Sequence, residues 1–230
     1  MAGALEFILN GRPVRVENCS PNTTLLEYLR SRGLTGAKEG CAEGDCGACS
    51  VAMVDCDADG RPTYRAINSC LIPVCLMAGR EIVSVEGVGC PGSIHPVQRK
   101  MVEHFGSQCG YCTPGFICSM FEGYYRDDLC TEDDLDDQLS GNLCRCTGYR
   151  PIRDAALEAF SLRRRRGDES QTKKELETPH VHPPQYCYGG RVVSYREDVF
   201  AERLKKSDAK PGTAQYESGG EKFFTIPAIG

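Results

Sequence analysis

The stretch Cys41-Ala42-Glu43-Gly44-Asp45-Cys46-Gly47-Ala48-Cys49 is the most informative part of this 230-residue chain. Its three cysteines are spaced C-x4-C-x2-C, which is typical of plant-type [2Fe–2S] sites. The glycines let the backbone bend tightly around a metal group, and backbone N–H groups in such a loop can stabilise thiolate charge. Cys70 is the expected fourth ligand, and the nearby Cys75 is its rival. A zinc site is the alternative interpretation, because zinc is also held by cysteine pairs.

A second group of cysteines lies further along the chain. Cys109 and Cys112 are spaced C-x2-C, and Cys144 and Cys146 are spaced C-x-C. Each pair falls at a junction between predicted helices, so two helical hairpins could present two thiolates each to one cluster. Taken alone, this spacing also fits a zinc site or a redox dithiol. Beside the first loop it predicts a second [2Fe–2S] cluster, and two one-electron centres in one chain imply an electron relay.

The remaining cysteines are expected to be buried packing residues or inert thiols, since free cysteine is among the most buried residue types. They are Cys19, Cys56, Cys75, Cys90, Cys118, Cys130 and Cys187. The four histidines form no metal-binding pattern with the cysteines.

Around the first loop the pattern predicts a small α+β domain over residues 1–90. Residues 5–9 and 14–16 read as a hairpin, because Asn10-Gly11 suits a two-residue turn with positive φ. Thr24 and Glu27 have capping-box spacing at the start of a helix over residues 24–30, and Gly33 follows its end. Strands are expected at residues 50–54 and 81–85, with a further candidate at 64–67.

Residues 91–162 are predicted to form an all-α domain. Apolar residues recur at helical spacing over 97–105 and 116–124. Thr113-Pro114 starts a helix well, Thr131 with Asp134 caps an acidic helix, and residues 152–162 follow Pro151 as another. Beyond them, residues 163–230 are expected to be an irregular connector or partner-wrapping tail, with one helical hint at 199–204.

Composition excludes several functional classes. The net charge of -5 argues against nucleic-acid binding, which depends on a basic surface. The sequence contains no apolar run that could span a bilayer and no secretory signal, so a cytoplasmic location without a membrane partner is expected. Without an export signal, fifteen cysteines are better read as metal ligands and buried thiols than as disulfides.

Three motifs resemble those of the molybdenum hydroxylases, the family of xanthine dehydrogenase and aldehyde oxidase. They are LTGAKEGCAEGDCGAC at residues 34–49, GSQCGYCTPGF at 106–116, and GNLCRCTGYRPI at 141–152. The resemblance covers about residues 5–162 and is highly specific as a set. Glu39, Glu43 and Asp45, with Gly106-Ser107, look more like xanthine dehydrogenase than its carbon-monoxide- or aldehyde-oxidising relatives.

The resemblance implies a β-grasp, plant-type ferredoxin-like domain followed by a four-helix [2Fe–2S] domain. It implies that a molybdenum–pterin centre on another polypeptide or domain hydroxylates the substrate, with electrons passing singly through both clusters to FAD and then NAD. The cluster held by Cys109, Cys112, Cys144 and Cys146 would lie nearer molybdenum, and the one held by Cys41, Cys46, Cys49 and Cys70 nearer the flavin. Gln108 matches a pterin-contacting residue.

The expected function is therefore the iron–sulfur subunit of a xanthine dehydrogenase-like oxidoreductase of purine catabolism, with FAD-binding and molybdenum-pterin-binding partner subunits or domains. A related aldehyde or N-heterocycle hydroxylase is one alternative, and a free-standing ferredoxin-type carrier is another. Residues 163–230 resemble the connector that precedes the FAD domain in fused enzymes. A split enzyme and a truncated reading frame are both compatible with that feature.

Overall fold

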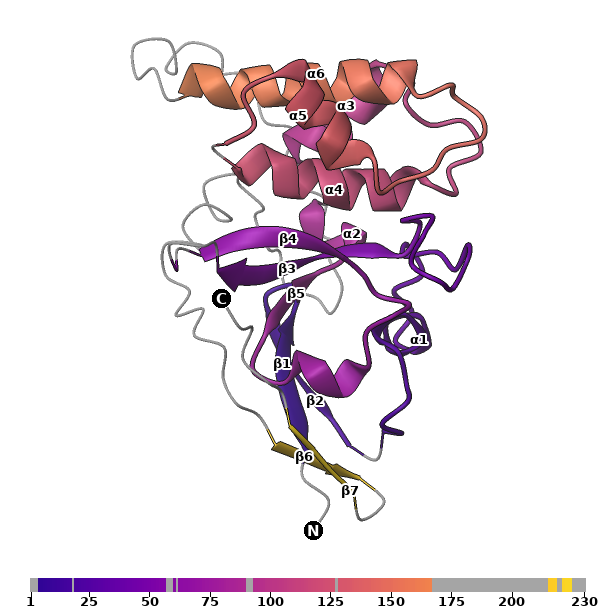
Figure 1. Ribbon diagram of the computed structural model, residues 1–230, viewed down its shortest axis with the longest axis vertical. Coiled ribbons are helices and arrows are strands. Elements are labelled where there is room, and N and C mark those ends of the chain that lie inside the picture. Colours follow the sequence, from indigo (N-terminus) through magenta and orange to yellow (C-terminus); the bar gives the residue numbers. More distant parts are fainter. Residues whose placement is uncertain are drawn as a thin grey trace.

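The computed structural model describes residues 4–17, 19–56, 60, 62–89, 93–126, 128–166, 215–218 and 221–224. Cys90, Cys187 and the predicted helix at 199–204 lie outside these residues. The fold is a mixture of strands and helices, in which a five-stranded sheet lies beneath a layer of helices (Figure 1).

The sheet has the strand order β2-β1-β5-β3-β4. Its strands are β1 (Leu5–Leu9), β2 (Arg12–Val16), β3 (Ser50–Cys56), β4 (Pro62–Asn68) and β5 (Glu81–Val83). The β1–β2 and β3–β4 pairs are antiparallel, and β5 joins them by pairing parallel to β1 and antiparallel to β3. At the predicted hairpin turn, Asn10 and Gly11 have φ of 51° and 74°, as a two-residue turn of this kind requires.

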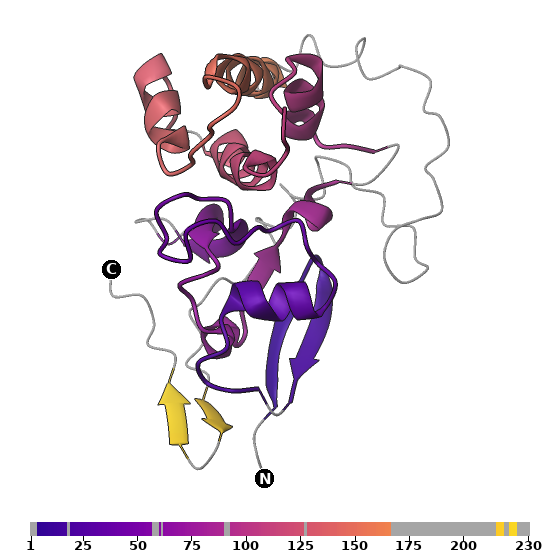
Figure 2. The ribbon, with the colours of Figure 1, turned by 90° about the vertical axis from the view of Figure 1, so that its right-hand side faces the viewer.

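Helix α1 (Leu25–Ser31) covers one face of the sheet (Figure 2). The predicted capping box is present, because the Thr24 side chain accepts from the Glu27 N–H and the Glu27 carboxylate accepts from the Thr24 N–H. Leu25 and Leu29 are fully buried and pack in one cluster with strand residues of β1, β3 and β5. The amphipathic face of a short helix thus closes the core on this side.

The opposite face of the sheet packs against helix α4 (Thr113–Tyr125). Ala52 and Tyr64 belong to the same buried cluster as Phe116 and Phe121, and the Tyr64 and Phe121 rings lie 4.7 Å apart between centroids. Strand β3 is buried on both faces from Ser50 to Val54, as expected of a strand covered on both sides. Sheet and helices therefore share one continuous core.

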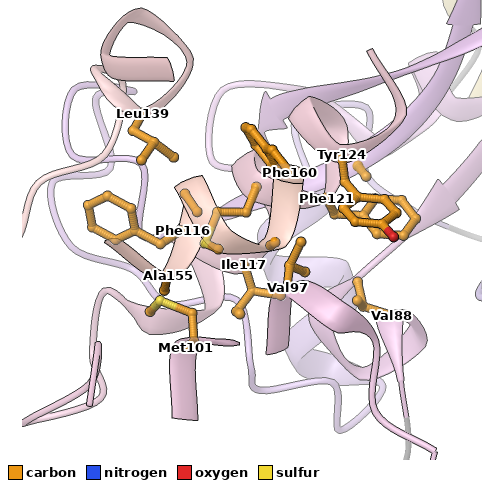
Figure 3. Packing of buried hydrophobic residues seen from close by; sticks show 14 of the residues in the cluster. Val88, Val97, Met101, Phe116, Ile117, Phe121, Tyr124, Leu139, Ala155 and Phe160 are labelled. Atoms are coloured by element: carbon orange, nitrogen blue, oxygen red, sulfur yellow. The ribbon is translucent and has the colours of Figure 1, made fainter. Parts of the chain in front are cut away.

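Three further helices complete the layer above α4. They are α3 (Pro96–Glu103), α5 (Glu132–Leu139) and α6 (Arg150–Arg166). Their apolar residues converge on α4, as Figure 3 shows for Val97 and Met101 from α3, Leu139 from α5 and Phe160 from α6. The predicted Thr131–Asp134 capping box is present at α5.

The structure differs from the sequence-based expectations at four places. Strand β5 ends at Val83, and Val85 begins the short helix α2 (Val85–Val88) instead of extending the strand. The side chain of Asn10 accepts the Ser84 N–H at 2.8 Å, so this donor is satisfied outside the sheet. Helix α6 continues to Arg166, and a two-stranded hairpin, β6 (Gln215–Ser218) with β7 (Glu221–Phe224), was not predicted. A 3-10 turn, η1 (Val74–Met77), was also not predicted.

Candidate functional site

The loop at residues 36–49 lies between α1 and β3 and contains no helix or strand. Its ends are held together by the Lys38 N–H, which donates to the Ala48 carbonyl at 2.9 Å. Ala42, Gly44 and Gly47 have positive φ, so the loop turns repeatedly. A Cβ at Gly40 would lie 2.7 Å from the Cys46 sulfur, which shows how closely the backbone wraps this thiol.

The first four predicted ligands come together as two pairs. The Cys41 thiol interacts with the Cys46 side chain, and the Cys70 thiol interacts with that of Cys49 and with the charge of Cys41. The Cys41 sulfur also accepts the backbone N–H groups of Glu43 and Cys46, both at 3.4 Å. These hydrogen bonds lower the pKa of Cys41 to about 7, whereas burial and then Cys49 raise the pKa of Cys70 to about 11.

Cys75, the rival fourth ligand, lies elsewhere. It is buried in η1, and its sulfur is 3.9 Å from the Pro21 carbonyl oxygen. Burial raises its pKa, with a smaller contribution from Cys19. Cys70 is the cysteine that lies beside Cys49, so the geometry favours Cys70 as the fourth ligand.

The second four predicted ligands are also paired. Cys109 interacts with Cys146, and Cys112 with Cys144, so each pair joins the C-x2-C motif to the C-x-C motif. A backbone N–H from Tyr111 and then Cys146 lower the pKa of Cys109, and burial raises the pKa of Cys112 to about 12. The arrangement repeats that of the first set on a different local fold.

Thr147 is a residue that the sequence analysis missed. Its hydroxyl lies 3.1 Å from the Cys144 sulfur, and its backbone N–H donates to the same sulfur at 3.5 Å. Burial opposes ionisation of Cys144, but these bonds dominate and lower its pKa. The position directly after the C-x-C motif was the available signal.

A [2Fe–2S] cluster needs two thiolates on each of its two irons, so two adjacent pairs fit it well. Backbone and hydroxyl donors directed at Cys41 and Cys144 would stabilise the negative charge of bound sulfur. Within the described residues, no three histidine, cysteine or acidic side chains are grouped as ligands of a single metal ion. In that part of the chain every cysteine is a free thiol. The four paired thiols at each site, with the donors directed at Cys41 and Cys144, fit the chemistry of a [2Fe–2S] cluster.

The two cysteine sets lie side by side and are joined by hydrogen bonds. The Leu143 N–H donates to the Cys46 carbonyl at 3.0 Å, and Leu143 directly precedes Cys144. The Tyr111 hydroxyl, between Cys109 and Cys112, donates to the Glu39 carbonyl in the first loop. A backbone hydrogen bond thus connects Cys46, a predicted ligand of the first set, to Leu143, the neighbour of Cys144 in the second.

The second set opens to the surface. Cys109, Cys146 and Gln108 are exposed, whereas Cys112, which directly precedes α4, is half-buried. Beside them runs an open groove of about 500 Å³, lined by Met101, Val102 and Phe105 among others. Phe105 is 81% exposed, which is unusual for a large apolar side chain.

The described helices include none that is both long and apolar enough to traverse a bilayer.

Comparison with known proteins gives a consistent assignment for both cysteine sets. Residues 7–75 match the family described as "2Fe-2S iron-sulfur cluster binding domain", and residues 84–157 match "[2Fe-2S] binding domain". The chain is 44% identical over 153 residues to xanthine dehydrogenase of Emericella nidulans, which is 66% of this chain and 11% of that protein. It is 46% identical over 157 residues to human aldehyde oxidase, or 67% of this chain and 12% of that protein.

Among solved structures, a chain of quinoline 2-oxidoreductase from Pseudomonas putida 86 matches with a TM-score of 0.60 and 32% identity. The match covers 71% of this chain and 97% of that chain. The matched region therefore corresponds to nearly all of one polypeptide in that structure, but to about a tenth of the two curated relatives.

Proposed function

Because this chain belongs to the iron–sulfur part of the molybdenum hydroxylases, we propose that it transfers single electrons from a molybdenum–pterin centre to FAD and then NAD. Two [2Fe–2S] clusters would supply the one-electron redox chemistry. The observation that carries the proposal is the gathering of eight cysteines into two sets of four that lie side by side, joined by the hydrogen bonds from the Leu143 N–H to the Cys46 carbonyl and from the Tyr111 hydroxyl to the Glu39 carbonyl.

Each cluster would be held by one set. Cys41, Cys46, Cys49 and Cys70 are the ligands proposed for the first, and Cys109, Cys112, Cys144 and Cys146 for the second. The thiols of Cys109 and Cys146 are exposed beside Gln108, which supports placing the molybdenum–pterin partner at this surface and Gln108 as a pterin contact. The FAD-bearing partner would then approach the first set.

The domain organisation follows the same logic. We propose a β-grasp ferredoxin-like domain over residues 1–90, a four-helix domain over 91–162, and a connecting segment over 163–230. The two family matches, at 7–75 and 84–157, support two cluster-binding units in this order. The shared core between β3, β4 and α4 means that these units pack as one body.

The proposed activity of the complete enzyme is that of xanthine dehydrogenase, which would act in purine catabolism in the cytoplasm. The residues Glu39, Glu43 and Asp45 support this choice, as does the likeness to xanthine dehydrogenase of Emericella nidulans. The likeness to human aldehyde oxidase supports a related aldehyde or N-heterocycle hydroxylase as the second candidate.

Two measurements test the proposal. Anaerobically purified chain should contain about four irons and four acid-labile sulfides, and should give paramagnetic signals on reduction. Zinc without sulfide would refute the cluster assignment. The chain should also co-purify from its native host with molybdenum and FAD, in a complex that reduces NAD when given xanthine. A complex that contains clusters but lacks molybdenum would refute the functional assignment alone, and one that oxidises only aldehydes would select the second candidate.

A further inference from the structure

A buried contact joins the first ligand loop to the segments that carry the two motifs of the second cysteine set, C-x2-C and C-x-C. Gly47 lies between Cys46 and Cys49, and its carbonyl oxygen accepts the side-chain Nδ2–H of Asn142 at 3.0 Å. Asn142 is only 3% exposed, and its Oδ1 accepts the Ser119 hydroxyl at 2.5 Å. Both ends of the Asn142 amide are therefore satisfied, one by the first loop and the other by α4.

The fit around the Gly47 carbonyl is tight. A Cβ at Gly115 would lie 2.1 Å from this oxygen, and a Cβ at Gly47 would lie 2.4 Å from the Asn142 nitrogen and 2.3 Å from the Gly141 carbonyl oxygen. Such separations are far below ordinary contact distance, so neither glycine can take a side chain without moving backbone. The Gly47 carbonyl oxygen is therefore closely confined between Gly115 and the Asn142 side chain.

The sequence positions of these residues give the contact its significance. Asn142 precedes Cys144 by two residues, and Gly115 follows Cys112 by three, in the first turn of α4. Gly47 is flanked by ligands of the first set. The hydrogen bond from Asn142 and the close approach of Gly115 to the Gly47 carbonyl thus position the first site against both cysteine motifs of the second, C-x-C and C-x2-C.

We propose that Asn142 is a positioning residue that fixes the separation of the two cluster sites, and with it the electronic coupling between them. The inference rests on the proposed function of the two cysteine sets. A primary amide suits this role because it donates to Gly47 and accepts from Ser119 at the same time. Losing it would leave the buried Ser119 hydroxyl without this partner. The Gly47 carbonyl would keep its hydrogen bonds from the Ser50 hydroxyl and N–H, which come from its own side, and would lose the bond that ties it to the second set, so the loops would settle at altered spacing.

The test compares three variants of the full chain with both clusters loaded. Asn142→Ala removes the amide, and Ser119→Ala removes only the group that holds Oδ1. Gly141→Ala is the matched control, because its Cβ would have nothing within 4 Å although it directly precedes Asn142. Iron and sulfide content is measured first, to establish that each variant holds both clusters.

The decisive readout is the magnetic interaction between the two clusters in the fully reduced chain, measured by electron paramagnetic resonance. Dipolar splitting falls with the cube of distance, so it reports spacing directly. We expect a smaller or broadened splitting in Asn142→Ala, a weaker change of the same kind in Ser119→Ala, and none in Gly141→Ala.

A second readout needs no clusters. In the metal-free chain, amide exchange at Leu143, whose N–H donates to Cys46, should accelerate by up to about tenfold in Asn142→Ala, because a net hydrogen bond is worth about that factor. The inference would be overturned if Asn142→Ala held four irons and still showed the splitting and the amide exchange rate of the wild type. It would also be overturned if Gly141→Ala changed the splitting and the exchange rate as much as Asn142→Ala does. If Asn142→Ala does not fold, Ser119→Ala decides the question by the same criteria. A wild-type chain without clusters would overturn the proposed function as well, and the iron content shows this first.

Discussion

Replacing Cys70 by alanine should remove one cluster, and replacing Cys75 by alanine should remove none. The Cys70 thiol lies beside Cys49 and the charge of Cys41, whereas the Cys75 sulfur faces the Pro21 carbonyl at 3.9 Å. Iron content should therefore fall from about four to about two per chain in Cys70→Ala and stay near four in Cys75→Ala.

Before any metal is added, Cys75→Ala should be the less stable of the two variants, although it is the one expected to keep its iron. Cys75 is 4% exposed, so removing its sulfur leaves a methyl-sized cavity that costs about 1 kcal/mol. Cys70 is only half-buried, so the metal-free Cys70→Ala chain should lose less. With clusters bound the order should reverse, because a ligand that binds only the folded state stabilises it.

The assay is iron and sulfide analysis together with denaturant unfolding of the metal-free and loaded chains. The reasoning would be refuted if Cys75→Ala lost half of its iron while Cys70→Ala kept all of it. Equal iron loss in both variants would show instead that the loop as a whole, and no single fourth thiol, determines cluster retention.

Three further predictions concern the supporting structure. Phe121→Ala should destabilise the chain by about 3–5 kcal/mol in denaturant unfolding, because this fully buried ring lies where α4 meets the sheet. Thr131→Ala should cost about 1 kcal/mol by removing the cap that the Asp134 N–H uses at the start of α5. Glu158 has its pKa lowered first by Lys100, so its stabilisation is present above the ordinary carboxyl pKa and is lost as pH falls through the lowered value. Stability measured against pH should therefore fall less steeply on the acid side in Glu158→Gln than in the wild type, and a slope equal to the wild type would contradict this.

Local signals in the sequence predicted most of the individual elements. The Asn10-Gly11 turn and the Thr24 and Thr131 caps each depend on side chains within a few residues of one another, so the sequence contains the whole cause. Strand β5 was predicted too long because what ends it is distant. Asn10, 74 residues from Ser84, bonds the Ser84 N–H.

The candidate site was predictable as a set of cysteines, and their grouping remains a prediction that metal analysis must test. Spacing alone did not indicate that Cys41 would contact Cys46 while Cys49 contacted Cys70, because that pairing depends on how the loop meets β4. Asn142 gave no signal either. A single buried amide has no periodicity, and its partners Gly47 and Ser119 are 95 and 23 residues away.

Helix α4 explains why the two cysteine sets are held as one unit. Its first turn follows Cys112, and its body is buried against β3 and β4, where Tyr64 packs on Phe121. Strand β3 in turn begins directly after Cys49. Cys112 therefore adjoins α4 and Cys49 adjoins β3, and these two elements pack against each other. Separating the two sites would require opening the core that α4 and β3 share. Because such cores resist deformation, the shared core keeps the two sites next to each other, and the Asn142 contact at its edge fixes the separation that remains free between the two ligand loops.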